Sequence, residues 1–211
     1  MIHPLNSILW FGVALFAWSP ALPRYATAQE NCALKKENND LKVYTCDSEN
    51  EKFKTLRAEL VLKNTSFEKL LTFVEDIDNY VNWQYNAVAA NLIRKTPQHG
   101  LRYRMIVDAP WPLADRELIA EMSTRFDTVA QILHITTRSV VVADAPVDGN
   151  MVRIPFSEGT WRVSRAYAGA LRIDYRLRID PGGYVPAWLA NMAMAEGPFY
   201  SFTKLKEKLQ E

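Results

Sequence analysis

The feature that most limits how this chain can fold is a long series of segments in which apolar and polar residues alternate. The series begins after Trp83 and continues for about 100 residues, in segments of strand length. The clearest segment is LRIDYRLRID, at 171–180. Its alternate positions are all apolar or aromatic: Leu171, Ile173, Tyr175, Leu177 and Ile179. This pattern predicts a meander of antiparallel strands with one dry face and one face in water.

A strand and a helix are predicted before the meander. FKTLRAELVLK, at 53–63, is typical of a strand. TSFEKLLTFVED, at 65–76, has an apolar stripe with helical spacing, and Thr65 and Glu68 have the spacing of a capping box. The helix is therefore expected to begin at Thr65.

A second helix is predicted to close the chain. Apolar residues recur at near-helical spacing after Pro186, which suits the first turn of a helix. Gly197 and Pro198 lie within this helix, and a kink is expected there because proline lacks the amide and crowds the carbonyl four residues back. These elements predict an α+β fold, in which a curved antiparallel sheet wraps around a long C-terminal helix.

The first residues have the pattern of a targeting segment. SILWFGVALFAW, at 7–18, is an apolar run too short to span a bilayer, and it is followed by Pro20 and by ATA at 26–28. We interpret residues 1–28 as a signal peptide and expect the product to be exported, either periplasmic or secreted. Because MIHPLN lacks Lys and Arg, a short N-terminal membrane anchor remains the alternative.

The two cysteines are expected to form a disulfide. Cys32 and Cys46 flank a segment with the turn cluster ENND at its centre, so that two short strands folding back near Asn39 would place them opposite each other. The alternative is a pair of separate buried thiols.

The charge and histidine content of the chain limit the kinds of partner it can bind. The formal net charge is +1 and no run of five like charges occurs, so neither nucleic acid nor a polybasic membrane contact is indicated. His99 and His134 are the only histidines outside the predicted signal peptide, which argues against a multi-histidine metal site.

No repeat, low-complexity tract or linker follows Gln29, which favours a single domain.

Several strings resemble the START lipid-transfer domain family. They are WPLADRE at 111–117, Trp83, Trp161 and DPGGYVPAWLANMAMAEGP at 180–198, and the similarity extends over roughly 32–211. The resemblance implies that residues 29–211 form one START-like lipid-binding domain with a helix-grip fold and an internal hydrophobic cavity. It further implies a lipid or sterol-like ligand and transient contact with membranes. It implies no cofactor and no catalytic conversion of the ligand. Some phospholipid carriers of the family have a charged pair around the tryptophan that corresponds to Trp83, three residues before it and one after it. In this chain those positions hold Tyr80 and Gln84, which disfavours a phosphocholine headgroup.

Arg116 is the main candidate for a polar contact with a ligand. It shares a strand face with Leu118, Ala120 and Met122, and a buried guanidinium needs a carboxylate, several carbonyls or a polar ligand group. One interpretation is a structural salt bridge with Asp115 or another carboxylate. The other is a polar anchor for a headgroup, hydroxyl or carboxylate.

The remaining candidates are apolar or aromatic. Together with Arg116 they form the predicted ligand-binding set: Tyr103, Met105, Leu118, Met122, Tyr175, Trp188, Met192 and Phe199. Methionine and tyrosine suit an adaptable pocket with a few polar groups. The alternative for each is an ordinary core position.

Three classes of function are consistent with these features. The leading hypothesis is an exported protein that binds and carries a lipid-like molecule. The second is a helix-grip enzyme of the cyclase or hydrolase type, although no catalytic motif and no catalytic residue is identified. The third is an interaction module whose own side chains fill its core.

Overall fold

The structure is a computed structural model that describes residues 31–47, 55–96, 100–140, 147 and 149–210, with only the backbone described for 187–192. The first strands are β1 (Cys32–Glu37), β2 (Leu41–Cys46), β3 (Thr55–Lys63), β4 (Ala87–Thr96) and β5 (Gly100–Val107). They are followed by β6 (Arg116–Asp127), β7 (Ile132–Ser139), β8 (Val152–Arg153), β9 (Phe156–Tyr167) and β10 (Ala170–Asp180). The helices are α1 (Phe67–Glu75), the 3-10 helix η1 (Ile77–Asn82) and α2 (Ala187–Gln210).

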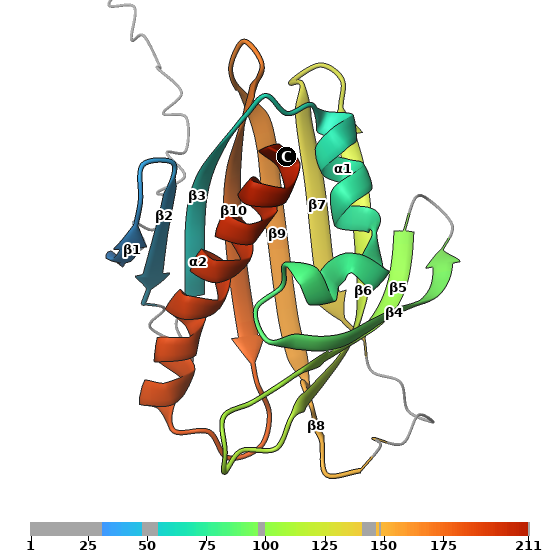
Figure 1. Cartoon of the computed structure of the whole chain (residues 1–211), viewed down its shortest axis with the longest axis vertical. Coiled ribbons are helices and arrows are strands. Elements are labelled where there is room, and N and C mark those ends of the chain that lie inside the picture. Colours follow the sequence, from blue (N-terminus) through green and yellow to red (C-terminus); the bar gives the residue numbers. More distant parts are fainter. Residues whose placement is uncertain (1–30, 48–54, 97–99, 141–146, 148, 211) are drawn as a thin grey trace, which may run out of the picture.

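The strands form one sheet in the order β1-β2-β3-β10-β9-β7-β6-β5-β4, with β8 beside β6 (Figure 1). All neighbours in this order pair antiparallel, whereas the short β8 pairs parallel with β6. The predicted antiparallel meander is confirmed. Chain order did not indicate that β3 pairs with β10, which joins the N-terminal hairpin to the last strand of the meander.

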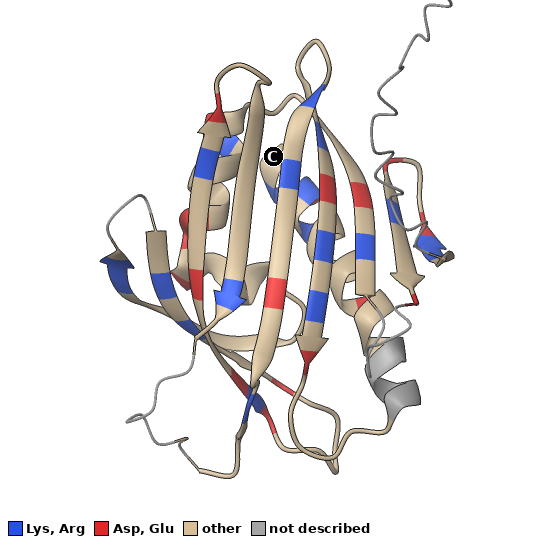
Figure 2. Ribbon diagram, turned by 180° about the vertical axis from the view of Figure 1, so that it is seen from behind, with Lys and Arg blue, Asp and Glu red and all other residues tan. Residues whose placement is uncertain are grey.

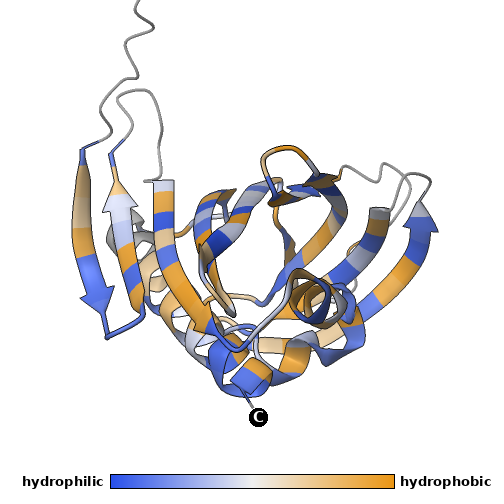
Figure 3. Cartoon of the chain, turned by 90° about the horizontal axis from the view of Figure 1, so that it is seen from above, coloured by the Kyte–Doolittle hydropathy of each residue, from blue (hydrophilic) through white to orange (hydrophobic). Residues whose placement is uncertain are grey.

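Both helices lie on the same side of the curved sheet (Figures 1 and 2). Seen from above in Figure 3, apolar and polar residues alternate along the strands, as the sequence pattern requires. α2 lies against β2 and β3 and buries Phe202, Leu205 and Leu209 in the core. The helix-grip prediction is confirmed, and α2 continues through Pro198 as one helix. Among the described residues, no helix combines the length and apolarity needed to cross a membrane.

The start of α1 differs from the prediction by one residue. Ser66, not Thr65, is the N-cap, and its hydroxyl accepts a hydrogen bond from the Lys69 amide at 3.2 Å. The Thr65 hydroxyl instead donates to the carbonyl of Lys63 at 3.1 Å. Serine and threonine are both favoured at the N-cap, so the sequence alone does not distinguish the two positions.

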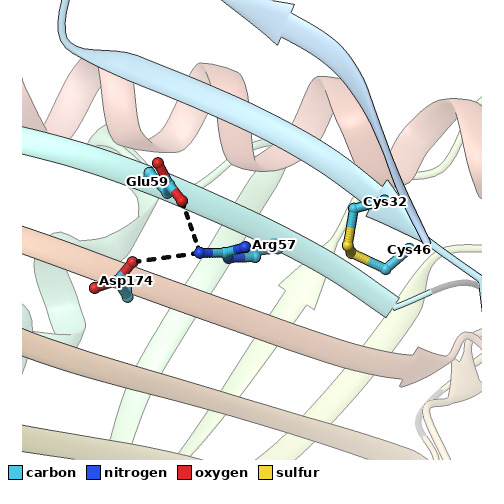
Figure 4. Close-up of a disulfide and its surroundings, with 5 residues drawn as sticks. All are labelled: Cys32, Cys46, Arg57, Glu59 and Asp174. Carbon is cyan, nitrogen blue, oxygen red and sulfur yellow. Dashed lines mark hydrogen bonds and ion pairs between the residues drawn. A yellow bond between two sulfur atoms is a disulfide. The ribbon is translucent and has the colours of Figure 1, made fainter. Parts of the chain in front are cut away.

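The N-terminal hairpin is closed by the predicted disulfide. Cys32 and Cys46 are directly opposite each other in the β1–β2 ladder, and a bond joins their sulfur atoms (Figure 4). The interpretation as two separate thiols is therefore wrong. The predicted signal peptide lies outside the described residues.

One buried carboxylate on the outer face of the sheet forms ion pairs with two arginines, and so joins β6 to β5 and β8. Glu117, whose side chain is 3% exposed, accepts from Arg104 Nε at 2.6 Å and from Arg153 Nε at 2.8 Å. Burial raises the pKa of the Glu117 carboxyl, but the hydrogen bonds from the two arginines outweigh it and leave the pKa below its ordinary value. Alternation along the strand predicts that Glu117 lies on the polar outer face. In the structure it lies there, and Arg153 of β8 covers its carboxylate.

We expect Glu117→Gln to lower the free energy of unfolding by about 3 kcal/mol at neutral pH, because both arginines lose a charged partner. A carboxyl with a depressed folded pKa stabilises above its unfolded pKa, and this contribution is lost as the pH falls through the folded pKa. The stability gap between the two proteins should therefore close under acidic conditions, as measured by urea unfolding at several pH values.

The matched control is Glu121→Gln, on the same strand face. Glu121 contacts Arg102 at 2.6 Å, but its side chain is 38% exposed, so the expected loss is below about 1 kcal/mol. Equal losses for the two variants, or a gap independent of pH, would contradict the buried role of Glu117.

Candidate ligand-binding cavity

A cavity of about 380 Å³ lies between the inner face of the sheet and α2. This volume is within the range of about 300–1,000 Å³ that is typical of small-molecule sites. Its lining is contributed by α1, η1, strands β5 to β7, β9 and β10, α2 and the connecting segments at 83–86, 108–113, 154 and 181–185. Most of the lining side chains are apolar or aromatic. The cavity is therefore suited to a predominantly hydrophobic molecule.

Five of the predicted ligand-binding residues line this cavity. They are Tyr103, Met105, Arg116, Leu118 and Tyr175. Met122 shares the inner face but is fully buried in the core rather than lining the cavity. Phe199 packs beneath the Lys36 ammonium, which is 5.3 Å from its ring centre, and also lies outside the lining. The side chains of Trp188 and Met192 are outside the described residues.

Two tyrosine hydroxyls in the lining lack protein partners. Tyr80 donates to the carbonyl of Val74 at 2.9 Å, whereas Tyr103 and Tyr175 make no hydrogen bond within the described part of the chain. Burial raises the pKa of both Tyr103 and Tyr175, and the nearby Tyr103 raises that of Tyr175 further. A tyrosine hydroxyl is neutral at physiological pH even at its ordinary pKa of about 10, so both hydroxyls can donate.

Arg116 is held by backbone carbonyls. It is 7% exposed, and its guanidinium donates to the carbonyls of Ala114, of Pro181 at 3.4 Å and of Gly182 at 3.5 Å. Burial lowers the pKa of Arg116, and the Asp115 carboxylate opposes this effect. The partners are thus carbonyls instead of the carboxylate of the salt-bridge interpretation, and they fasten the 181–182 turn to β6.

Gly182 explains why this turn lies so close to β8. It has a φ of +69°, and a Cβ there would lie 2.8 Å from the carbonyl oxygen of Arg153. Any other residue would therefore be strained and would push the turn outward. The DPGG string marked this turn in the sequence but not its contact with Arg116.

Sequence reasoning missed several lining residues on the central strands. Thr137, Ser157, Trp161 and Leu177 all occupy inward positions of β7, β9 and β10. The alternation along each strand could have identified them once one inward residue was known. Trp83 also lines the cavity, and its buried indole nitrogen has no hydrogen-bond partner within the described residues.

Two loops at one end of the cavity carry exposed aromatic side chains. Trp111 is 92% exposed and Tyr184 is 87% exposed. Their neighbours Pro110, Leu113 and Val185 line the cavity, so both loops form part of its edge. We name Trp111 and Tyr184 the aromatic rim.

Comparison with known proteins identifies the architecture. No protein-family model matches the chain. An uncharacterized protein of Pseudomonas aeruginosa is 22% identical over 183 residues, which are 86% of this chain and 88% of that protein. The crystal structure of a STAR-related lipid transfer protein fragment from Xanthomonas axonopodis has a TM-score of 0.76 at 23% identity, covering 85% of this chain and 99% of that one. Human STARD10 has a TM-score of 0.74 at 18% identity, covering 85% and 73%.

The fold is START-like. Human StAR-related lipid transfer protein 5 is also similar, with a TM-score of 0.72 at 14% identity and 89% of each chain covered. The resemblance predicted from the sequence strings is thereby confirmed at the level of the fold.

We expect Arg116→Leu to lower the free energy of unfolding by about 2 kcal/mol, because three carbonyls lose their donor. Affinity for an uncharged hydrophobic probe should change less, since the guanidinium is already occupied by the protein. Chemical denaturation and probe titration measure the two effects. Arg138→Leu is the control, because Arg138 is 68% exposed and its pair with Glu158 should contribute below about 1 kcal/mol. Unchanged stability with lost binding would instead support the polar-anchor interpretation.

Proposed function

We propose that this protein is an exported carrier that binds one lipid, sterol-like or other hydrophobic molecule in its internal cavity and transfers it through water. The observation that carries this proposal is the largely apolar cavity of about 380 Å³ beneath α2 in a START-like fold. Removing apolar ligand surface from water is the dominant favourable term for such binding. The protein would supply a shielded site and carry out no chemical step.

The charges at the cavity support carriage over catalysis. Among the described lining residues, the charged ones are Asp108, Arg116 and Glu196. Asp108 is exposed, Arg116 is bound by carbonyls, and Glu196 pairs with Lys36 at 2.5 Å. We therefore assign no acid, base, nucleophile or cofactor to the site.

Export is supported by two independent features. The disulfide between Cys32 and Cys46 suits an oxidising compartment. The apolar run at 7–18 followed by ATA at 26–28 fits cleavage of a signal peptide after Ala28. A hydrophobic cargo outside the cytoplasm would need such a carrier to cross water between membranes.

Transient membrane contact is proposed at the aromatic rim. Trp and Tyr side chains favour the interface between lipid and water, where their rings are buried and their polar atoms stay hydrated. The rim loops border the cavity, so contact there would place its edge against the bilayer and let cargo pass without crossing bulk water.

The carrier function is tested by extracting natively purified protein and analysing the organic phase by mass spectrometry. We expect a bound hydrophobic molecule in the wild type and at least a tenfold lower occupancy in Met105→Trp, since the larger side chain would fill cavity volume. Ile106→Trp is the matched control, because Ile106 is the next residue of β5 and alternation places it on the opposite face. An empty extract together with no uptake of any hydrophobic probe would refute the carrier function.

We expect the double variant Trp111→Ala, Tyr184→Ala to slow transfer of a fluorescent lipid between vesicles by about tenfold. Burial of each large side chain at an interface contributes about 2 kcal/mol at most, and part of this gain is lost on docking. Equilibrium affinity for the same lipid should not change. Tyr167→Ala is the control, since Tyr167 is 55% exposed but lies at the β9–β10 turn, at the opposite end of the sheet (Figure 1). Equal slowing in the control would argue against docking through the rim.

A further inference from the structure

The centre of the inner sheet face is built from small and hydroxyl-bearing residues. In one inward row, Met122, Thr137 and Gly159 are paired in register across β6, β7 and β9. In the adjacent row Ala120 pairs with Ser139, whose hydroxyl accepts from the Ser157 amide of β9 at 2.9 Å. Five of these six positions have short side chains, and two of them, Thr137 and Ser157, line the cavity. We name Ala120, Thr137, Ser139, Ser157 and Gly159 the cavity floor.

Two tyrosines border this floor from opposite sides. Tyr103 of β5 is next to Ala120 in the ladder and is 4% exposed. Tyr175 of β10 reaches toward Gly159, because a Cβ built on that glycine would lie 3.5 Å from the Tyr175 hydroxyl and 2.5 Å from the Thr137 hydroxyl. Because Gly159 has no side chain, the hydroxyls of Thr137 and Tyr175 can both lie close to it.

These two tyrosines line the cavity, and their hydroxyls have no hydrogen-bond partner among the described residues. A ligand that displaced water from the cavity would leave them unpaired, at a cost of about 1–3 kcal/mol each, unless it supplied an acceptor. Thr137 donates its hydroxyl to the carbonyl of Gly159 at 3.4 Å, and no hydrogen bond joins it to either tyrosine. An oxygen atom of a ligand on the floor would supply the missing acceptor.

Among the described lining residues, no charged side chain lies at the cavity floor or beside its two tyrosines. The charged lining residue on the same strands is Arg116, which precedes Ala120 by four residues, or about 13 Å along an extended strand. Its guanidinium is already bound to the 181–182 turn and to Ala114. A phosphate, carboxylate or ammonium group on the floor would be buried without a counter-charge, which is far more costly than burying a hydroxyl or carbonyl.

We propose that the cavity floor, between Tyr103 and Tyr175, binds the uncharged oxygen-bearing end of the ligand. The cargo is thus a neutral lipid with a hydroxyl or carbonyl group, and charged headgroups are excluded from this end. The inference rests on the proposed carrier function and adds the chemical class of the cargo and its orientation. The oxygen lies at the sheet, and the hydrocarbon part extends toward α2 and the rim.

A series of ligands with one common tail tests this selectivity. The series is hexadecane, 1-hexadecanol, 2-heptadecanone, palmitate and hexadecylphosphocholine, each competing with the uncharged fluorophore 1-aminoanthracene in the full mature protein. We expect the alcohol and the ketone to bind at least tenfold more tightly than the alkane, the carboxylate and the phosphocholine. This preference is measured as a ratio, so a general change in cavity size would not produce it.

The variants Tyr103→Phe and Tyr175→Phe should each lower the alcohol-to-alkane affinity ratio severalfold, and together they should bring it near one. Thermal stability should stay nearly the same, because each change removes a hydroxyl that makes no hydrogen bond to the described protein. Tyr80→Phe is the matched control, since its hydroxyl is bonded to Val74. It should lower the melting temperature and keep the ratio.

The outcomes separate the two proposals. If all five ligands bind but the charged ones bind as tightly as the alcohol, or the double variant keeps the ratio, the floor assignment is overturned while the carrier function stands. If neither the fluorophore nor any ligand binds, and the native extract is empty, both proposals are refuted.

Discussion

Eight residue pairs join β3 to β10, from Lys63 opposite Ala170 to Leu56 opposite Leu177. This ladder connects two parts of the chain that are far apart in sequence and places the N-terminal hairpin beside the end of the meander. The hairpin strands then provide the surface on which α2 lies. Because α2 packs against β2 and β3 and also lines the cavity, the ladder fixes the position from which this helix closes the cavity.

The charged triplet Asp115-Arg116-Glu117 connects three neighbouring segments to the beginning of β6. Asp115 accepts from the Ala109 amide at 3.3 Å, and its carbonyl accepts from the Val152 amide at 2.8 Å. Arg116 points inward and holds the 181–182 turn, whereas Glu117 points outward and holds Arg153. Successive side chains of a strand point to opposite faces, so three consecutive residues can bind partners on both sides of the sheet.

The electrostatics of the molecule separate into two regions. The outer face of the sheet carries many arginines, several of them paired with carboxylates, as Arg57 is with Glu59 and Asp174 (Figures 2 and 4). The inner face around the cavity floor carries uncharged hydroxyl groups, from Thr137, Ser157 and the two tyrosines. Ion pairs near water cost little to maintain, whereas a charge buried between Tyr103 and Tyr175 would find no charged side chain among the described residues of the cavity floor. This separation favours uncharged cargo within the site.

The sequence by itself determined the elements and the faces they bury. Alternation along β10 identified its inward residues, including Tyr175, and the spacing of Cys32 and Cys46 around a turn predicted their disulfide. These features are local, because side-chain direction repeats every two residues in a strand and the turn brings its own flanks together.

Tertiary structure alone decided which of these inward residues line a cavity and which fill the core. Met122 and Leu118 share one strand face, but Met122 is packed in the core and Leu118 borders the cavity. Arg116 likewise has carbonyl partners from residues 65 and 66 positions away along the chain, which no local pattern specifies. The reason is physical: whether a buried position is filled depends on the volume of side chains arriving from distant strands and from α2.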